Sequence, residues 1–124
     1  MAGFRGLKVY QAAFELAIDI FEITRQFPID EKYGLIDQVR RSSRATAAII
    51  AEAYRKRTYP KSFVSKLIEA DGEATETQVW LDFARRFEYI TERKYDELIQ
   101  RSEEIGRMLG GMLKHPEKFC GSRK

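Results

Sequence analysis

Residues 38–57, QVRRSSRATAAIIAEAYRKR, contain a run of small residues between two basic clusters. With about 3.6 residues per turn, this stretch folds as a helix with two different sides. Apolar residues and small hydroxyl residues share one side: Val39, Ser42, Thr46, Ile49, Ile50 and Ala53. The arginines share the opposite side, with Ala48 and Ala51 between them. The pattern predicts a helix that packs one side into a core and turns its basic side outward.

Three further segments show helical spacing, and turn signals separate them. The breaks fall at Phe27–Asp30, at Thr58–Pro60, before Thr91 and at His115–Pro116. We predict helices over about residues 6–26, 32–57, 60–89 and 92–114, with a C-terminal tail at 116–124. Short connections place neighbouring helices antiparallel. Because no stretch alternates with the period of a strand, the expected fold class is all-α. The expected architecture is an antiparallel up-down-up-down four-helix bundle in a single domain over residues 1–124.

Each segment has an apolar stripe with steps of three and four residues, which is the spacing of bundle helices. The stripes expected to face the core are Leu7, Tyr10, Phe14, Ala17 and Phe21 in the first segment, Ile36, Val39, Ser43, Thr46, Ile50 and Ala53 in the second, Phe63, Leu67, Ala70, Ala74, Thr77, Leu81 and Ala84 in the third, and Tyr95, Leu98, Ser102, Ile105, Leu109 and Met112 in the fourth.

The first segment carries a second apolar face nearly opposite its stripe: Val9, Ala12, Leu16, Ile20, Ile23 and Phe27. A helix that is apolar on two faces is buried on two faces, so we predict that one face meets another chain. The third segment also has apolar residues away from its stripe. The residues expected at an oligomer interface are Val9, Leu16, Ile20, Ile23, Trp80 and Phe83. The alternative is that the first and third helices lie diagonally in the bundle and pack on more neighbours.

The basic side of residues 38–57 is the candidate nucleic-acid-binding surface: Arg40, Arg41, Arg44, Arg55, Lys56 and Arg57. Arginine binds phosphate in a bidentate manner. The surface lacks interleaved aromatic residues that would stack on bases, so we expect phosphate contact rather than sequence readout. The alternative is that the arginines form ion pairs, because Glu52 and the acidic segment LIEADGEATETQ at 67–78 supply carboxylates. Phosphates or carboxylates bound to the arginines would offset the unfavourable position of three positive charges near a helix N-terminus.

The composition permits nucleic-acid binding without requiring it. The 124 residues include 22 Lys and Arg and 19 Asp and Glu, which gives a net charge of +3 and a pI of about 9.0.

The one cysteine, Cys120, has no intramolecular disulfide partner, so we expect a reducing compartment. The first residues, MAGFRGLKVYQ, lack the apolar core of a signal peptide, and acidic residues interrupt the apolar stretch 12–23. We therefore expect a cytoplasmic protein without a membrane span.

Residues that would support catalysis or metal binding are sparse. The one histidine, His115, lies beside Pro116 at the expected end of the last helix, where it would complement the helix dipole. No His or Cys residues have the spacing of metal ligands. The glycines at 106, 110 and 111 are not followed by the Lys-Ser/Thr pair of a phosphate-binding loop. We therefore expect no enzyme, no metal and no cofactor.

A series of short motifs resembles one known family in order and spacing. The matching stretches are LKVYQ at 7–11, FP at 27–28, KYGL at 32–35, QVRR at 38–41 and IAE at 50–52. Over about residues 4–113 the sequence resembles the small four-helix-bundle proteins encoded in an intervening sequence of bacterial large-subunit ribosomal RNA genes. The family motif Ser-Ile-Pro-x-Asn-Ile-Ala-Glu-Gly falls on residues 45–53, where its proline, asparagine and glycine are absent.

The resemblance implies that the bundle assembles into a homopentamer. A more distant likeness to the basic pentameric accessory protein of diversity-generating retroelements favours RNA or DNA as a partner. The expected function is therefore that of a small homo-oligomeric scaffold that binds nucleic acid through the basic side of the second helix. The alternative is a protein-interaction scaffold whose arginines form structural or inter-subunit ion pairs.

Overall fold

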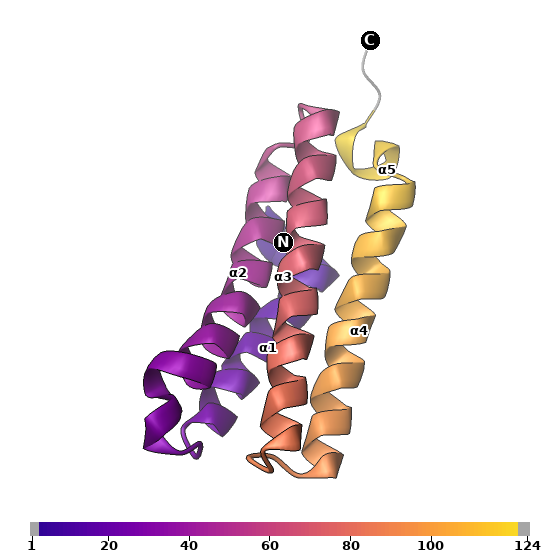
Figure 1. The fold of residues 1–124 in the computed structure, drawn as a ribbon. Coiled ribbons are helices and arrows are strands. Elements are labelled where there is room, and N and C mark those ends of the chain that lie inside the picture. The colour runs from indigo at the N-terminus through magenta and orange to yellow at the C-terminus, as the bar shows by residue number, and fades with distance from the viewer. Residues whose placement is uncertain (1–2, 122–124) are drawn as a thin grey trace.

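The computed structural model describes residues 3–121, and over these residues the chain is helical without strands. Figure 1 shows four long helices, α1 (Lys8–Thr24), α2 (Asp37–Arg55), α3 (Pro60–Arg86) and α4 (Glu92–Lys114). Short helices occupy the start, the α1–α2 connection and the end of the chain: η1 (Phe4–Gly6), η2 (Ile29–Glu31), η3 (Lys32–Ile36) and α5 (Glu117–Cys120). The predicted all-α class is therefore confirmed.

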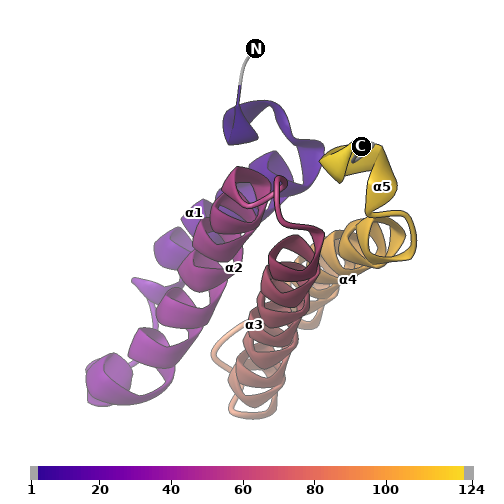
Figure 2. The same ribbon diagram turned by 90° about the horizontal axis from the view of Figure 1, so that it is seen from above.

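Each long helix packs against two others. The pairs α1 and α2, α2 and α3, α3 and α4, and α1 and α4 are in contact, which places α1 diagonally across from α3. The short connections reverse the chain direction, so the turn between α2 and α3 lies at the same end as α5 (Figure 1), and the view from above in Figure 2 looks onto this end. The connections between α1 and α2 and between α3 and α4 lie at the other end.

The core contains the apolar stripes predicted for the last three helices, with few exceptions. All seven stripe residues of α3, from Phe63 to Ala84, are buried. In α4 the stripe from Leu98 to Met112 is buried, whereas Tyr95 is only half buried. Two polar members of the core, Ser42 and Thr77, pair with each other, because their hydroxyl oxygens lie 2.7 Å apart. Burying a hydroxyl without such a partner would be costly.

Helix α1 is turned differently from the prediction. Its buried residues are Val9, Ala13, Leu16, Ile20 and Thr24. Ala13 and Leu16 face the centre of the bundle, where they meet residues of α2, α3 and α4. The predicted core stripe instead contains Phe14, of which 44% is exposed. The buried side of α1 carries aliphatic and small side chains and no aromatic ring, and it is the side that packs against α2 and α4.

The predicted oligomer interface therefore needs a correction. Val9, Leu16 and Ile20 are buried inside the chain itself, so they are core residues and offer no surface to a second chain. Ile23 is half buried and packs against the same core. Of the six residues predicted for the interface, Trp80 and Phe83 remain on the outside of α3, partly buried and exposed respectively.

Local signals explain where the helices begin and end. Pro60 opens α3 at its first turn. The hydroxyl of Thr91 accepts a hydrogen bond from the Lys94 amide at 3.1 Å and caps α4. The predicted tail at 116–124 contains the short helix α5, and its Phe119 stacks on Phe63 with 6.0 Å between ring centroids. Its last three residues, 122–124, lie outside the described part.

Candidate nucleic-acid interface

The basic residues of α2 point away from the core, because the helix buries Val39, Ile50 and Ala53 on its other side. They have three different environments. Arg41 faces α3, Arg40 and Arg44 face α1, and Arg55, Lys56 and Arg57 lie at the end of α2 next to the turn into α3.

Arg41 forms ion pairs with α3. One of its guanidinium nitrogens lies 3.4 Å from Glu73 Oε1, and another donates a short hydrogen bond to Glu76. The indole of Trp80 donates to the same Glu76 oxygen at 3.2 Å. The side chain of Arg41 is about half exposed, so each of these ion pairs contributes at most about 1 kcal/mol. For Arg41 the geometry agrees with the ion-pair alternative.

Arg40 is held against α1. Its Nε donates to the Thr24 hydroxyl at 2.8 Å, and a terminal nitrogen donates to the Phe21 carbonyl at 3.3 Å. Its guanidinium lies 4.5 Å from the centroid of the Phe21 ring, and the guanidiniums of Arg44 and Arg25 lie 5.8 and 5.9 Å from the same centroid. Burial, followed by the charges of Arg44 and Arg25, lowers the pKa of Arg40 below its usual value. Three cations thus surround one aromatic ring.

The end of α2 carries a different group of cations. Arg55 and Lys56 are exposed, and neither forms an ion pair with any residue in the described range 3–121. Arg57 lies 3.6 Å above the Tyr54 ring and donates from Nε to the Tyr54 carbonyl at 2.8 Å. Cations at a helix C-terminus also complement its dipole, which is the structural explanation for this position.

Two residues beyond the predicted set belong to this end of the bundle. Lys61 is exposed in the first turn of α3, and Tyr59 precedes it with 65% of its surface exposed. The sequence carries a signal for them, since no acidic residue occurs between Ala53 and Ile68. We call Arg55, Lys56, Arg57, Tyr59 and Lys61 the basic tip.

An apolar groove runs along the outer side of α1 and α2. Its volume is about 550 Å³. Phe14 and Ile18, which are 44% and 43% exposed, lie in it, and Arg44 stands at its edge. Its other lining residues are Phe4, Tyr10, Ala17, Phe21, Ala47, Ala48 and Ala51. Apolar side chains exposed side by side in a groove mark a contact surface.

A row of aromatic rings lies on the outside of α3. The ring centroids of Trp80 and Phe83 are 5.9 Å apart, and those of Phe83 and Phe87 are 5.8 Å apart. Tyr89 continues the row at 5.6 Å from Phe87. Phe83 and Phe87 are 44% and 49% exposed, so this row is a second apolar surface. We call Trp80, Phe83 and Phe87 the aromatic row.

Comparison with known proteins relates this geometry to a family. The family described as the 23S rRNA-intervening sequence protein matches residues 5–111. The chain belongs to this family. A crystal structure of a protein of unknown function from the S23 ribosomal protein family of Bacteroides thetaiotaomicron is similar, with a TM-score of 0.74 and 30% sequence identity. The similarity covers 86% of this chain and 98% of that one. No curated protein matches the chain.

The family match includes all the basic residues of α2, the aromatic row and every lining residue of the groove except Phe4, whereas α5 lies beyond it. The resemblance inferred from the short motifs is therefore confirmed. None of the helices in the described residues combines the length and the apolar character that a membrane span needs.

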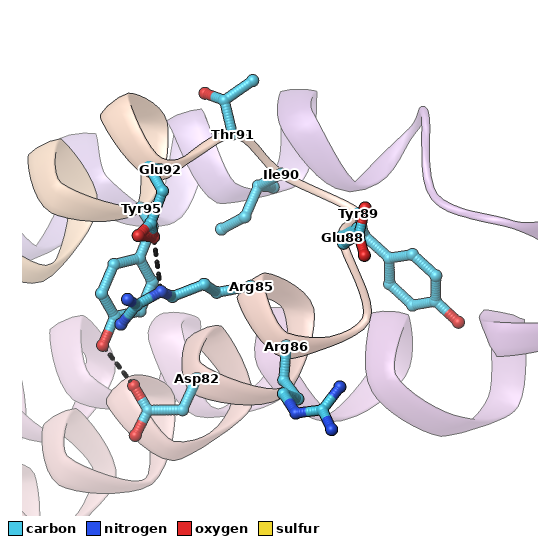
Figure 3. A pocket seen from close by; sticks show the side chains of 9 residues that line it. All are labelled: Asp82, Arg85, Arg86, Glu88, Tyr89, Ile90, Thr91, Glu92 and Tyr95. Carbon is cyan, nitrogen blue, oxygen red and sulfur yellow. Dashed lines mark hydrogen bonds and ion pairs between the residues drawn. The ribbon is translucent and has the colours of Figure 1, made fainter.

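The chain has a large open pocket at the turn between α3 and α4, with a volume of about 860 Å³. Figure 3 shows that Arg85 pairs with Glu92 and that the Tyr95 hydroxyl donates to Asp82, whereas Arg86 and Glu88 have no partner among the residues drawn. The hydrogen bond to Asp82 raises the pKa of Tyr95. Among the described residues no group of three or more His, Cys, Asp or Glu is placed to hold a metal ion. The pocket lining carries three carboxylates and two arginines, so its charges nearly balance.

Proposed function

We propose that this chain is a homo-oligomeric scaffold that binds the phosphate backbone of nucleic acid, with the basic tip as its principal contact. One observation carries the proposal: Arg55, Lys56 and Lys61 are exposed and make no ion pair within residues 3–121. Arg41, in contrast, is engaged by Glu73 and Glu76. Unpaired cations are available to phosphate without breaking an existing interaction.

The proposed assembly is a homopentamer, as the resemblance implies. A single chain has a net charge of +3, so five copies carry 5 × 3 = +15. One basic tip from each copy would lie at the same end of a ring. Phosphates bound by several tips at once would release many counterions, so affinity would fall steeply with salt concentration.

The tip supports backbone binding more than sequence readout. Its cations lie on a helix end and a turn, and Tyr59 is its one well-exposed ring, which would stack on an unpaired base of any sequence. This geometry favours single-stranded or looped nucleic acid with little sequence preference. We propose a binding role rather than a catalytic one.

The test is a fluorescence anisotropy titration of a single-stranded RNA at several salt concentrations. The variant Arg55→Gln/Lys56→Gln removes two unpaired charges, and we expect weaker binding. The slope of log affinity against log salt should fall by about 0.7 for each lost phosphate contact. The matched control is Lys32→Gln/Arg93→Gln, which removes two exposed charges at the opposite end of the bundle. Equal binding by both variants would rule out the tip as the contact.

The second candidate function is a protein-interaction scaffold whose arginines serve structure. The ion pairs of Arg41 with Glu73 and Glu76 favour it. This function predicts that the parent protein binds no nucleic acid at low salt and that Arg41→Gln lowers the free energy of unfolding. Salt-dependent binding by the parent would speak against it.

A further inference from the structure

The groove on α1 and α2 has an apolar floor and a basic edge. Arg44 stands at this edge, and Arg40 lies against Phe21 beside it. Neither arginine pairs with a carboxylate among residues 3–121. Arg25, the third cation around Phe21, pairs only with the exposed Glu22 of its own helix, at 3.5 Å. The groove therefore matches an occupant that combines bulky apolar groups with negative charge.

The aromatic row on α3 has this composition. Phe83 and Phe87 project from the helix, and carboxylates stand beside them. Glu76 accepts a hydrogen bond from the Trp80 indole but is already paired with Arg41. Glu88 follows Phe87 and is exposed, as is Arg86 on the other side of Phe87. Glu88 forms no ion pair with any residue that the structure describes. The row is thus an apolar ridge with an available carboxylate, Glu88, at one end.

We propose that the aromatic row of one copy binds in the groove between α1 and α2 of a second copy. The row is short enough to lie within the groove, because the eleven residue steps from Tyr10 to Phe21 span about 16 Å of helix and the seven steps from Trp80 to Phe87 span about 10 Å. One charge pair agrees as well, because Glu88 at the end of the row is available to pair with Arg44 at the edge of the groove. This inference rests on the homo-oligomer proposed above and names the surfaces that join its copies.

The contact joins two different surfaces of the same chain. The groove belongs to α1 and α2, whereas the row belongs to α3, which lies diagonally across the bundle from α1. Each copy therefore offers one groove and one row, and copies associate head to tail. Head-to-tail contacts produce closed rings when the rotation between copies closes, whereas a two-fold dimer would use the same patch twice.

The contact divides the basic residues of α2 by role. Arg40 and Arg44 are withdrawn into the joint between copies, while Arg55 and Lys56 lie at the end of the helix and stay accessible. Changes at Arg44 then act on assembly, and changes in the basic tip act on nucleic-acid binding.

A complementation experiment with full-length chains tests the contact. The variant Ala48→Trp fills the groove at an exposed position, and Phe83→Glu breaks the row at an exposed position. Light scattering during gel filtration should show each variant alone as a monomer of 14.5 kDa. An equimolar mixture should form a heterodimer of about 29 kDa, twice the mass of one chain. The reason is that Ala48→Trp keeps an intact row and Phe83→Glu keeps an intact groove. The mixture can therefore form one contact, in which the row of the first variant binds the groove of the second.

Matched controls separate this effect from general disruption. Gln100→Trp adds the same bulk on α4, and Ile68→Glu places a charge on α3 outside the row, so both should assemble like the parent. Circular dichroism checks that each variant is folded. If Ala48→Trp does not fold, Phe14→Arg blocks the groove from another exposed position.

The outcomes are distinguishable. A parent protein that is monomeric at micromolar concentration would overturn both the proposed assembly and this contact. An oligomeric parent whose groove and row variants remain oligomeric would overturn the contact alone. Monomeric variants that do not combine on mixing would also overturn it. Loss of RNA binding by Ala48→Trp with the oligomer intact would assign the groove to nucleic acid instead.

Discussion

The guanidinium of Arg40 lies 4.5 Å from the centroid of the Phe21 ring and joins α2 to α1. The same guanidinium donates hydrogen bonds to Thr24 and to the Phe21 carbonyl. A cation against an aromatic face contributes roughly 0.5–2 kcal/mol, depending on how far water is excluded. An arginine that the helical pattern assigns only to the outward basic side thus belongs in part to the structure of the bundle.

Replacing Thr24 tests this junction. Thr24→Val keeps the shape of a buried side chain and removes the oxygen that accepts from Arg40. We expect the free energy of unfolding to fall by about 1.5–3 kcal/mol, the range for hydrogen bonds to charged groups. Urea denaturation followed by circular dichroism measures the change. Thr75→Val is the control, because Thr75 is exposed and bonds only to the Asp71 carbonyl of its own helix.

The end of α3 allows a stabilising substitution. Glu88 has φ 64°, in the left-handed region that favours glycine. The Tyr89 amide donates to the Ala84 carbonyl at 2.8 Å, the hydrogen bond of a Schellman motif. We expect Glu88→Gly to raise the free energy of unfolding by about 1 kcal/mol. Arg86→Gly, two residues earlier and inside α3, should lower it by about as much. Equal effects of the two glycines would contradict this account.

The hydroxyl pair in the core should show energetic coupling. Ser42 Oγ and Thr77 Oγ1 lie 2.7 Å apart and are buried. Ser42→Ala leaves the Thr77 hydroxyl with only its bond to the Glu73 carbonyl at 3.0 Å. We expect each single change, Ser42→Ala or Thr77→Val, to cost about 1 kcal/mol. The double variant should cost less than the sum, because it removes both partners, and a double-mutant cycle measures the difference.

Stability should decline in alkali through Tyr95. The hydrogen bond to Asp82, followed by burial, raises the pKa of Tyr95 above its usual 10.0. Above about pH 10 the unfolded chain releases this proton before the folded chain does, so the folded state holds more protons and its stability falls as pH rises. Tyr95→Phe should reduce this loss, which urea denaturation between about pH 9 and pH 11 would show. Tyr59→Phe, an exposed tyrosine, is the control.

Much of the fold follows from local pattern. The apolar stripe of α3 predicts all seven of its buried residues, and the turn signals at Pro60 and Thr91 stand where helices begin. These signals act within one helix or one turn, so they need no knowledge of the neighbouring helices. The basic tip can also be read from local sequence, because its cations follow one another along the chain without an acidic residue between Ala53 and Ile68.

The sequence by itself determined the helices, their order and the residue types along each face. Only the tertiary structure decided which face of α1 turns inward, burying Ile20 and leaving Phe14 exposed. The tertiary structure also decided that Arg41 pairs with a carboxylate of α3 and that Arg40 packs against the ring of Phe21. The physical reason is that helical periodicity relates residues around one axis, whereas the rotation of that axis and the partners of a long side chain depend on the helices packed beside it.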